Sequence, residues 1–308
     1  DRLVHEKRSN FSNEVFLASE ENDRVITGSN YHAYVKLSEG CNQSCSFCAI
    51  PSFKGKLHSR TLESLVKEVT NLVKKGYKDF SFVSQDSSSY LRDLGHNDGL
   101  EQLIDAVEKI DGVKTARILY LYPSTTTHNL IDKIADSKVF VNYFDMPLQH
   151  ISQNMLKIMK RGKGAEKLIE LMNYMKSKPN SFVRTTFIAG HPGESEEDFE
   201  ELCSFVEEFG FDRGNVFSYS DEEGTSAETR DDKIEQELID ERAEILGDII
   251  SQTTIKSLEN DIGKSFEVYI DGESEEHEYL LSARKTIWAP QIDGEIKVDG
   301  LEAKVDVY

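Results

Sequence analysis

The chain has 308 residues, of which 38% are hydrophobic and 30% are charged, and its formal net charge is −20. This length and apolar content predict one large domain and a second, smaller one. There is no run of about 18 apolar residues and no charged-then-apolar leader, so the sequence indicates neither a membrane span nor an export signal. The excess of carboxylates opposes binding to polyanions and favours basic partners.

Residues 1–30 are polar and weakly patterned, and we expect them to form an arm or linker. From residue 31 to about 220, strand-like runs alternate with helical ones, which is typical of a parallel sheet with crossover helices. The predicted strands are Tyr31–Leu37, Asp79–Ser84, Ala116–Tyr122, Tyr143–Leu148, Val183–Ala189 and Asn215–Tyr219. The predicted helices are Leu62–Lys75, Leu100–Lys109, Thr127–Ala135, Ser152–Met159, Lys163–Lys176 and Glu196–Phe209. Six strand–helix repeats predict an α/β fold, an open, partial (β/α)6 barrel.

A longer helical run, 233–260, closes this core, for which we predict the bounds 31–262. Short β-like runs follow at Phe266–Ile270, Tyr279–Ser282, Thr286–Trp288, Gly294–Val298 and Ala303–Val307. We expect turns between them at Asp271-Gly272, Asp293-Gly294 and Asp299-Gly300. Residues 263–308 are therefore predicted to form a small all-β barrel.

This predicted barrel is strongly acidic. From Phe266 onward it carries eleven acidic and four basic residues, an excess of seven negative charges. Such a surface is a poor ligand for RNA and a good one for a protein rich in lysine and arginine. Trp288, beside Pro290, is either an interface anchor or part of the core.

The most informative pattern is C-x3-C-x2-C at Cys41, Cys45 and Cys48, directly after the first predicted strand. Thiolates are soft ligands for iron–sulfur clusters or zinc, and a four-iron cluster held by three of them keeps one iron open to a substrate or cofactor. A structural zinc site requires a fourth ligand instead, either His32 or His58. The alternative of another class is therefore a zinc-binding, non-enzymatic module that docks a basic partner.

The fourth cysteine, Cys203, lies at an apolar position of a predicted helix, and we expect it to be a small buried hydrophobe. A thiolate cluster without paired cysteines fits the reducing cytoplasm best, so a cytoplasmic location is predicted.

The cysteine spacing resembles that of the radical S-adenosylmethionine (SAM) superfamily, whose open iron binds the amino and carboxylate groups of that cofactor. Residues 49–60, AIPSFKGKLHSR, resemble the segment that follows the cluster loop in the methylthiotransferases. Within that family the AIPSF part is most similar to the ribosomal protein methylthiotransferases (RimO type), and the tRNA-modifying members carry a Val-Pro-Tyr-like version. By position, the C-terminal tail resembles the TRAM domain of the same family.

The resemblance implies an enzyme that uses a 4Fe-4S cluster and SAM to generate a 5'-deoxyadenosyl radical, which removes hydrogen from an unactivated carbon. The predicted reaction is β-methylthiolation of an aspartate of ribosomal protein S12, with an electron donor as a further partner and no membrane. A tRNA methylthiotransferase is the alternative within the class, disfavoured by the charge and by the AIPSF segment. Full-length members begin with a domain whose three cysteines bind a second 4Fe-4S cluster. No such cysteines precede Cys41, so we expect that domain to be missing here.

The resemblance also implies cofactor-binding residues in the first half of the core. Phe47 matches a family position beside the adenine, although it could equally pack under the cysteine loop. Gln85 and Asp86 follow the second predicted strand, where many superfamily members bind the amino group of the cofactor. Capping of a turn is the alternative role of Asp86.

Three further cofactor contacts are predicted in the second half of the core. Gln149 lies in a Pro-Leu-Gln-His motif that resembles one of the family. Arg184 is a charged residue in an otherwise apolar strand, and its partner is either a cofactor carboxylate or an acid such as Glu194. Gly190 allows the backbone to approach a ligand closely. We predict no catalytic side chain, and the sequence indicates no role for Asp145.

Overall fold

The large domain contains an open sheet of six parallel strands. The computed structural model describes residues 17–21, 24–162 and 164–299, so much of the predicted N-terminal arm lies outside the described residues. The strands are β1 (His32–Lys36), β4 (Asp79–Val83), β5 (Thr115–Ile118), β6 (Phe140–Asp145), β7 (Phe182–Ala189) and β8 (Arg213–Ser218). Their spatial order follows the chain, with β1 and β8 as the two edges. This order confirms the predicted α/β core and its six strands.

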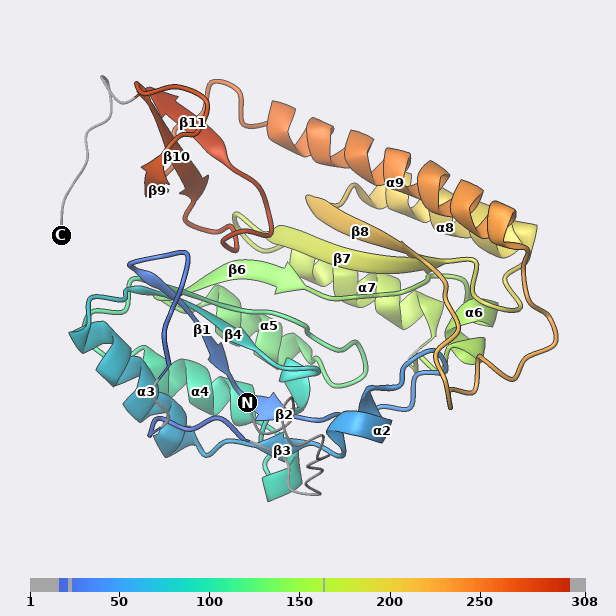
Figure 1. Ribbon diagram of the computed structural model, residues 1–308, viewed down its shortest axis with the longest axis horizontal. Coiled ribbons are helices and arrows are strands. Elements are labelled where there is room, and N and C mark those ends of the chain that lie inside the picture. Colours follow the sequence, from blue (N-terminus) through green and yellow to red (C-terminus); the bar gives the residue numbers. More distant parts are fainter. Residues whose placement is uncertain (1–16, 22–23, 163, 300–308) are drawn as a thin grey trace, which may run out of the picture.

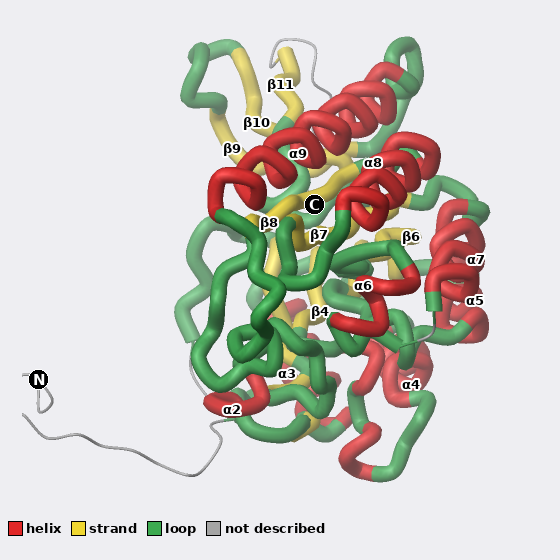
Figure 2. The backbone as a smooth tube through the Cα atoms, turned by 90° about the vertical axis from the view of Figure 1, so that its right-hand side faces the viewer, coloured by secondary structure: helices red, strands yellow, loops and turns green. Residues whose placement is uncertain are grey.

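Helices cover one face of this sheet (Figures 1 and 2). They are α3 (Leu62–Lys74), α4 (Gly99–Val107), α5 (His128–Ala135), α6 (Gln153–Ile158), α7 (Ala165–Lys176) and α8 (Glu196–Phe209). Shorter elements connect them: β2 (Ser38–Glu39), α2 (Ile50–Lys54), β3 (His58–Ser59), and the 3-10 helices η1 (Ser87–Ser89) and η2 (Arg92–Leu94). No helix in the described part of the chain is long and apolar enough to cross a bilayer.

The alternation of side chains along the strands separates core from site. Val35 of β1 and Phe82 of β4 point toward the helices and are fully buried with Leu65 of α3. Their neighbours in sequence point to the opposite, inner face, because successive residues of a strand alternate between faces. The inner face carries His32 and Arg117 among its polar side chains. The inner face is therefore the polar face of the sheet, and the outer face forms the core with the helices.

The long helix α9 (Gln236–Glu259) packs beside α8 and over the edge strand β8 (Figure 1). Glycine permits this approach, because a Cβ added at Gly214 of β8 would lie 3.1 Å from Ile250. Burial of Ile239, Leu246 and Ile250 on one side of α9 provides its packing energy. This confirms the helix that the sequence predicts after the barrel.

The C-terminal domain is an antiparallel sheet in the order β11-β10-β9, built from β9 (Val268–Glu273), β10 (Leu280–Lys285) and β11 (Ile296–Asp299). Two details of the prediction are wrong. Residues 286–288 form a turn, because Trp288 folds back and packs with Tyr143 and Phe182 of the barrel. The Asp271-Gly272 pair lies inside β9, where Asp271 is the extra residue of a bulge between two ladder pairs. The run 303–307 lies outside the described residues, and the proposed domain bounds remain predictions.

Candidate active site

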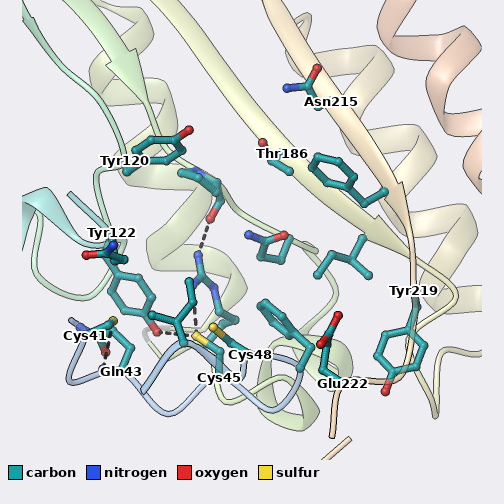
Figure 3. Close-up of a pocket in the computed structure, with 18 of the residues that line it drawn as sticks. Cys41, Gln43, Cys45, Cys48, Tyr120, Tyr122, Thr186, Asn215, Tyr219 and Glu222 are labelled. Carbon is teal, nitrogen blue, oxygen red and sulfur yellow. Dashed lines mark hydrogen bonds between the residues drawn. The ribbon is translucent and has the colours of Figure 1, made fainter. Parts of the chain in front are cut away.

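A cavity of about 530 Å³ opens at the carboxyl ends of the strands (Figure 3). The cysteine loop and the ends of five strands contribute its lining. The side chains that matter below are Cys41, Cys45, Cys48, Phe47, Gln85, Tyr122, Gln149, Arg161 and Arg184. The carboxyl ends of parallel strands are where barrel folds place their active sites.

All three cysteines of the predicted cluster loop line this cavity, as free thiols that are half-buried. The loop is held by backbone bonds from Cys41 N to Gly55 O (3.1 Å) and from Ser46 N to Met159 O (3.1 Å). Its first turn requires glycine, since Gly40 has φ +75° and an added Cβ would lie 2.1 Å from the carbonyl oxygen of Lys56. The sequence thus brings the three sulfurs to one end of the barrel.

Burial disfavours free thiolates in this loop. It raises the pKa of Cys41 to about 11 and also raises the pKa of Cys48 above its ordinary value. A metal centre would reverse this, because its positive charge deprotonates a coordinating thiol. The donor set is therefore suited to a bound metal cluster rather than to free nucleophilic thiols.

The described part of the chain does not assemble a zinc site. Among the residues that the structure describes, no three or more His, Cys, Asp and Glu side chains are placed to hold one metal ion. His32 lies at the other end of the barrel, where its Nε2 is 2.9 Å from Ser81 Oγ, and His58 is exposed on β3. Zinc needs its ligands around a single ion, whereas the thiolates of a four-iron cluster bind different irons.

Two glutamines that line the cavity have side-chain oxygens without a hydrogen-bond donor in the described residues. Gln85, at the end of β4, and Gln149, after β6, both line it, and the Oε1 atom of each is buried without a hydrogen-bond partner in the described residues. Gln149 also has φ +71°, a left-handed conformation that is uncommon outside glycine. Buried polar atoms are normally hydrogen-bonded, so these two oxygens are suited to a donor such as an ammonium or amino group of a ligand.

Asp86 is buried and is occupied by protein donors. Its carboxylate accepts hydrogen bonds from Gln43 Nε2 (2.8 Å), Ser88 Oγ (2.9 Å) and Ser89 Oγ (2.6 Å), and it caps η1. The capping alternative is therefore observed, and Asp86 ties the cysteine loop to β4 through Gln43. A direct cofactor contact of Asp86 stays a prediction.

Arg184 of β7 lines the cavity and has an acidic partner that the sequence did not identify. Its Nη1 is 2.9 Å from Oδ1 of Asp145, which is fully buried. Asp293 of the C-terminal domain lies behind it, 3.7 Å from Arg184 Nε. Glu194 pairs instead with Arg242 of α9 at 3.0 Å, so the predicted structural acid is present but is Asp145 rather than Glu194. Burial raises the pKa of Asp145 above its ordinary value despite Arg184.

Phe47 and Gly190 occupy different surroundings. Phe47 lines the cavity with its ring edge-on to His191, at a centroid distance of 6.3 Å. Gly190 has φ +79°, and a Cβ there would lie 2.5 Å from Ile239, so the close approach that requires glycine is to α9. The cofactor roles of both residues stay predictions.

Sequence reasoning missed the residues that surround Cys45. Arg161 Nη1 lies 3.4 Å from its sulfur. The hydroxyl of Tyr122 lies 3.7 Å from the same sulfur (Figure 3). The available signal was a cluster of basic and glycine residues, Lys160–Gly164, directly after a helix in an acidic chain.

Two families of known proteins match this chain, one after the other along its length. The model of the radical SAM superfamily matches residues 35–206, and that of the TRAM domain matches residues 262–306. Coproporphyrinogen III oxidase (HemN) of Escherichia coli, a radical SAM enzyme, shares the fold with a TM-score of 0.58 and 15% identity, over 76% of this chain and 57% of that one.

Two relatives are much closer in sequence. The ribosomal protein uS12 methylthiotransferase RimO of Aliarcobacter butzleri is 81% identical over 302 residues, which cover 98% of this chain and 68% of that protein. RimO of Campylobacter jejuni strain RM1221 is 55% identical over 98% of this chain and 69% of its own length. The chain therefore belongs to the RimO family of radical SAM methylthiotransferases, which confirms the family and the TRAM domain predicted from the sequence.

Proposed function

We propose that this chain performs the radical chemistry of uS12 methylthiolation, in which a methylthio group is installed on the β-carbon of an aspartate in ribosomal protein uS12. One observation supports it most. Cys41, Cys45 and Cys48 line the same cavity as the unsatisfied oxygens of Gln85 and Gln149, in a chain 81% identical to a RimO protein.

The three cysteines would hold a 4Fe-4S cluster. When both are bound, the reduced cluster would supply the electron that breaks a sulfonium C–S bond of SAM, and the resulting carbon radical would remove hydrogen from an unactivated carbon. Gln85 and Gln149 would accept hydrogen bonds from amino groups of the cofactor, and Phe47 would pack against its adenine.

The remaining predicted contacts act around these. Arg184 directs its guanidinium toward the cofactor carboxylate while Asp145 holds it in place. Asp86 acts through Gln43 on the cysteine loop, and Gly190 lets the loop after β7 pack tightly on α9.

The acidic C-terminal domain suits a basic protein substrate. Glu273, Glu275, Glu276 and Glu295 surround a groove beside residues 26–34, with Lys297 as its one lysine or arginine among the lining residues that the structure describes. A field of this sign attracts a protein rich in lysine and arginine and repels tRNA. We place the reaction in the reducing cytoplasm, where thiolates and clusters persist, with a low-potential electron donor as a second partner.

Sulfur insertion draws on a second 4Fe-4S cluster in this proposal. These 308 residues contain four cysteines, and Cys203, the one outside the trio, lies on α8 away from the cavity lining. The chain alone is therefore expected to cleave SAM without completing methylthiolation.

Anaerobic reconstitution with iron and sulfide tests the proposal. We expect about four irons per chain, 5'-deoxyadenosine on addition of SAM and dithionite, and no methylthiolated uS12. Absence of both the four-iron signal and 5'-deoxyadenosine would refute it. Binding of tRNA that weakens with salt, without binding of uS12, would favour the tRNA-modifying alternative.

A further inference from the structure

Arg161 is a buried cation in direct contact with one of the three cysteines. The residue is 8% exposed, and Nη1 donates to Cys45 Sγ at 3.4 Å while Nη2 donates to the carbonyl oxygen of Pro147. The guanidinium carbon lies 4.3 Å from the centroid of the Tyr122 ring. A sulfur, a carbonyl and an aromatic face thus surround this guanidinium.

What distinguishes Arg161 is the absence of a carboxylate. The other buried arginines of the described residues all form an ion pair with Asp or Glu: Arg60, Arg117, Arg184, Arg242 and Arg284. Arg161 forms none with any carboxylate in the described part of the chain, and its Nε is buried without a partner there. A buried charge is costly unless it is paired, so this cation requires an anion that the protein carboxylates do not supply.

The backbone fixes Arg161 against the cysteine loop. Helix α6 ends at Ile158, and Lys160 then adopts a left-handed conformation with φ +56°. This turn lets Arg161 N donate to Leu156 O at 2.8 Å, while Met159 O accepts from Ser46 N in the loop. The stack on the Tyr122 ring holds the planar guanidinium in one orientation. The cation is therefore positioned before any ligand binds.

We propose that Arg161 is a positioning residue for the metal centre, the counter-ion of Cys45 and of the cluster bound there, and that it raises the reduction potential of that cluster. This inference rests on the proposed function, because it requires a cluster at the three cysteines. On reduction the cluster takes one electron from an external donor, no bond is made or broken, and the negative charge of the centre increases. A fixed cation and a hydrogen bond at a cysteine sulfur stabilise the reduced form.

The test compares the reconstituted chain with its R161Q and K160Q variants, without SAM, in redox titrations followed by electron paramagnetic resonance. Lys160 is the matched control, since it is the neighbouring cation but is exposed and bonds to Ser226 Oγ instead of a cysteine. For R161Q we expect the equilibrium constant of one-electron reduction to fall about tenfold, which is ~59 mV more negative. K160Q is expected to match the unchanged chain.

The two measurements test different claims. Iron and sulfide content tests the proposed function, whereas the reduction potential tests the role of Arg161. An R161Q potential equal to that of the unchanged chain, or an equal shift in K160Q, would overturn the inference. So would a loss of SAM binding in R161Q at an unchanged potential, because Arg161 would then be a cofactor ligand.

R161K covers the case in which R161Q folds but does not retain iron. Retention of the cluster by R161K alone would support the counter-ion role, because lysine keeps the charge. Loss from both variants would show a requirement for the shape of arginine and would contradict the role of its charge.

Discussion

Arg117 and Arg161, which lie at opposite ends of the barrel, are buried in opposite ways. At the amino ends of the strands, Arg117 and Arg284 share the carboxylate of Asp79, at 2.8 and 2.7 Å, and all three side chains are at most 1% exposed. At the carboxyl ends, Arg161 contacts Cys45 and no carboxylate of the described residues. Where the buried arginines are paired with a carboxylate, they form a structural junction. Where the buried arginine has no carboxylate partner, an anionic ligand is expected.

The junction joins the two domains. Arg284 comes from β10 of the C-terminal sheet and also donates to the carbonyl oxygen of Trp288, while Arg117 comes from β5 and donates to Thr286 O. Burial alone would raise the pKa of Asp79, but the two guanidiniums hold it below its ordinary value. The small domain is therefore anchored at the end of the barrel opposite the cysteines (Figure 1).

The largest effect is expected at the cysteines, at the carboxyl ends of the strands. The change C45S should remove the cluster, because an alcohol replaces one of three thiolates, and iron content and 5'-deoxyadenosine formation should fall to the level of the chain without added iron. The matched change C203S, on α8, should leave both unchanged. Full iron content in C45S would show that Cys45 is not a ligand.

At the amino ends of the strands, D79A should destabilise the protein by about 3–5 kcal/mol, since it leaves two buried guanidiniums without the carboxylate of Asp79. The control is D105A, whose exposed pair with Lys133 should contribute less than about 1 kcal/mol. Urea unfolding can be followed by far-UV circular dichroism and by the fluorescence of Trp288, the single tryptophan. Since Trp288 is buried at the junction, its signal should change at lower urea in D79A. Equal midpoints for D79A and D105A would contradict the comparison.

These two ends also differ in how far the sequence predicted them. Periodicity and the cysteine spacing are local signals, and they predicted the six strands and the cysteine loop that lines the cavity. Partners distant in the chain carry no such signal. Asp145 reaches Arg184 only because β6 and β7 pair in register, and Asp79 meets Arg284 across 205 residues. The turn at Trp288 was missed because its burial in the barrel overrides a local β pattern.

Glu194 and Arg242 form a further buried ion pair, in which the carboxylate is only partly stabilised. Glu194 bonds to Arg242 at 3.0 Å, but Arg242 also reaches Glu196 at 2.8 Å, and burial outweighs the arginine and raises the pKa of Glu194 to about 7. The raised pKa means that the neutral acid is favoured in the folded state. The contribution of protonated Glu194 to the stability of the fold is complete below the ordinary pKa of 4.5 and is lost as the pH rises through about 7.

The change E194Q should remove this pH dependence. From pH 4.5 to 8, the free energy of unfolding should fall by on the order of 3 kcal/mol more in the unchanged protein than in E194Q. Urea titrations at both pH values measure it, with E196Q as the control, because Glu196 contacts the same Arg242 but is exposed. A parallel pH dependence in the unchanged protein and in E194Q would mean that Glu194 is already ionised when folded.

The smallest effect is expected from Y122F, which tests the contribution of the tyrosine hydroxyl at Cys45 independently of that of Arg161. The hydroxyl carries no charge and lies 3.7 Å from the sulfur, farther than the guanidinium at 3.4 Å, whereas the ring that supports Arg161 is retained by phenylalanine. The equilibrium constant of cluster reduction should therefore change by less than about threefold, well below the tenfold effect of R161Q. The same redox titration measures it. A shift in Y122F as large as that in R161Q would assign the tuning of the cluster to the tyrosine hydroxyl, and the unpaired arginine would then serve only to hold the ring in place.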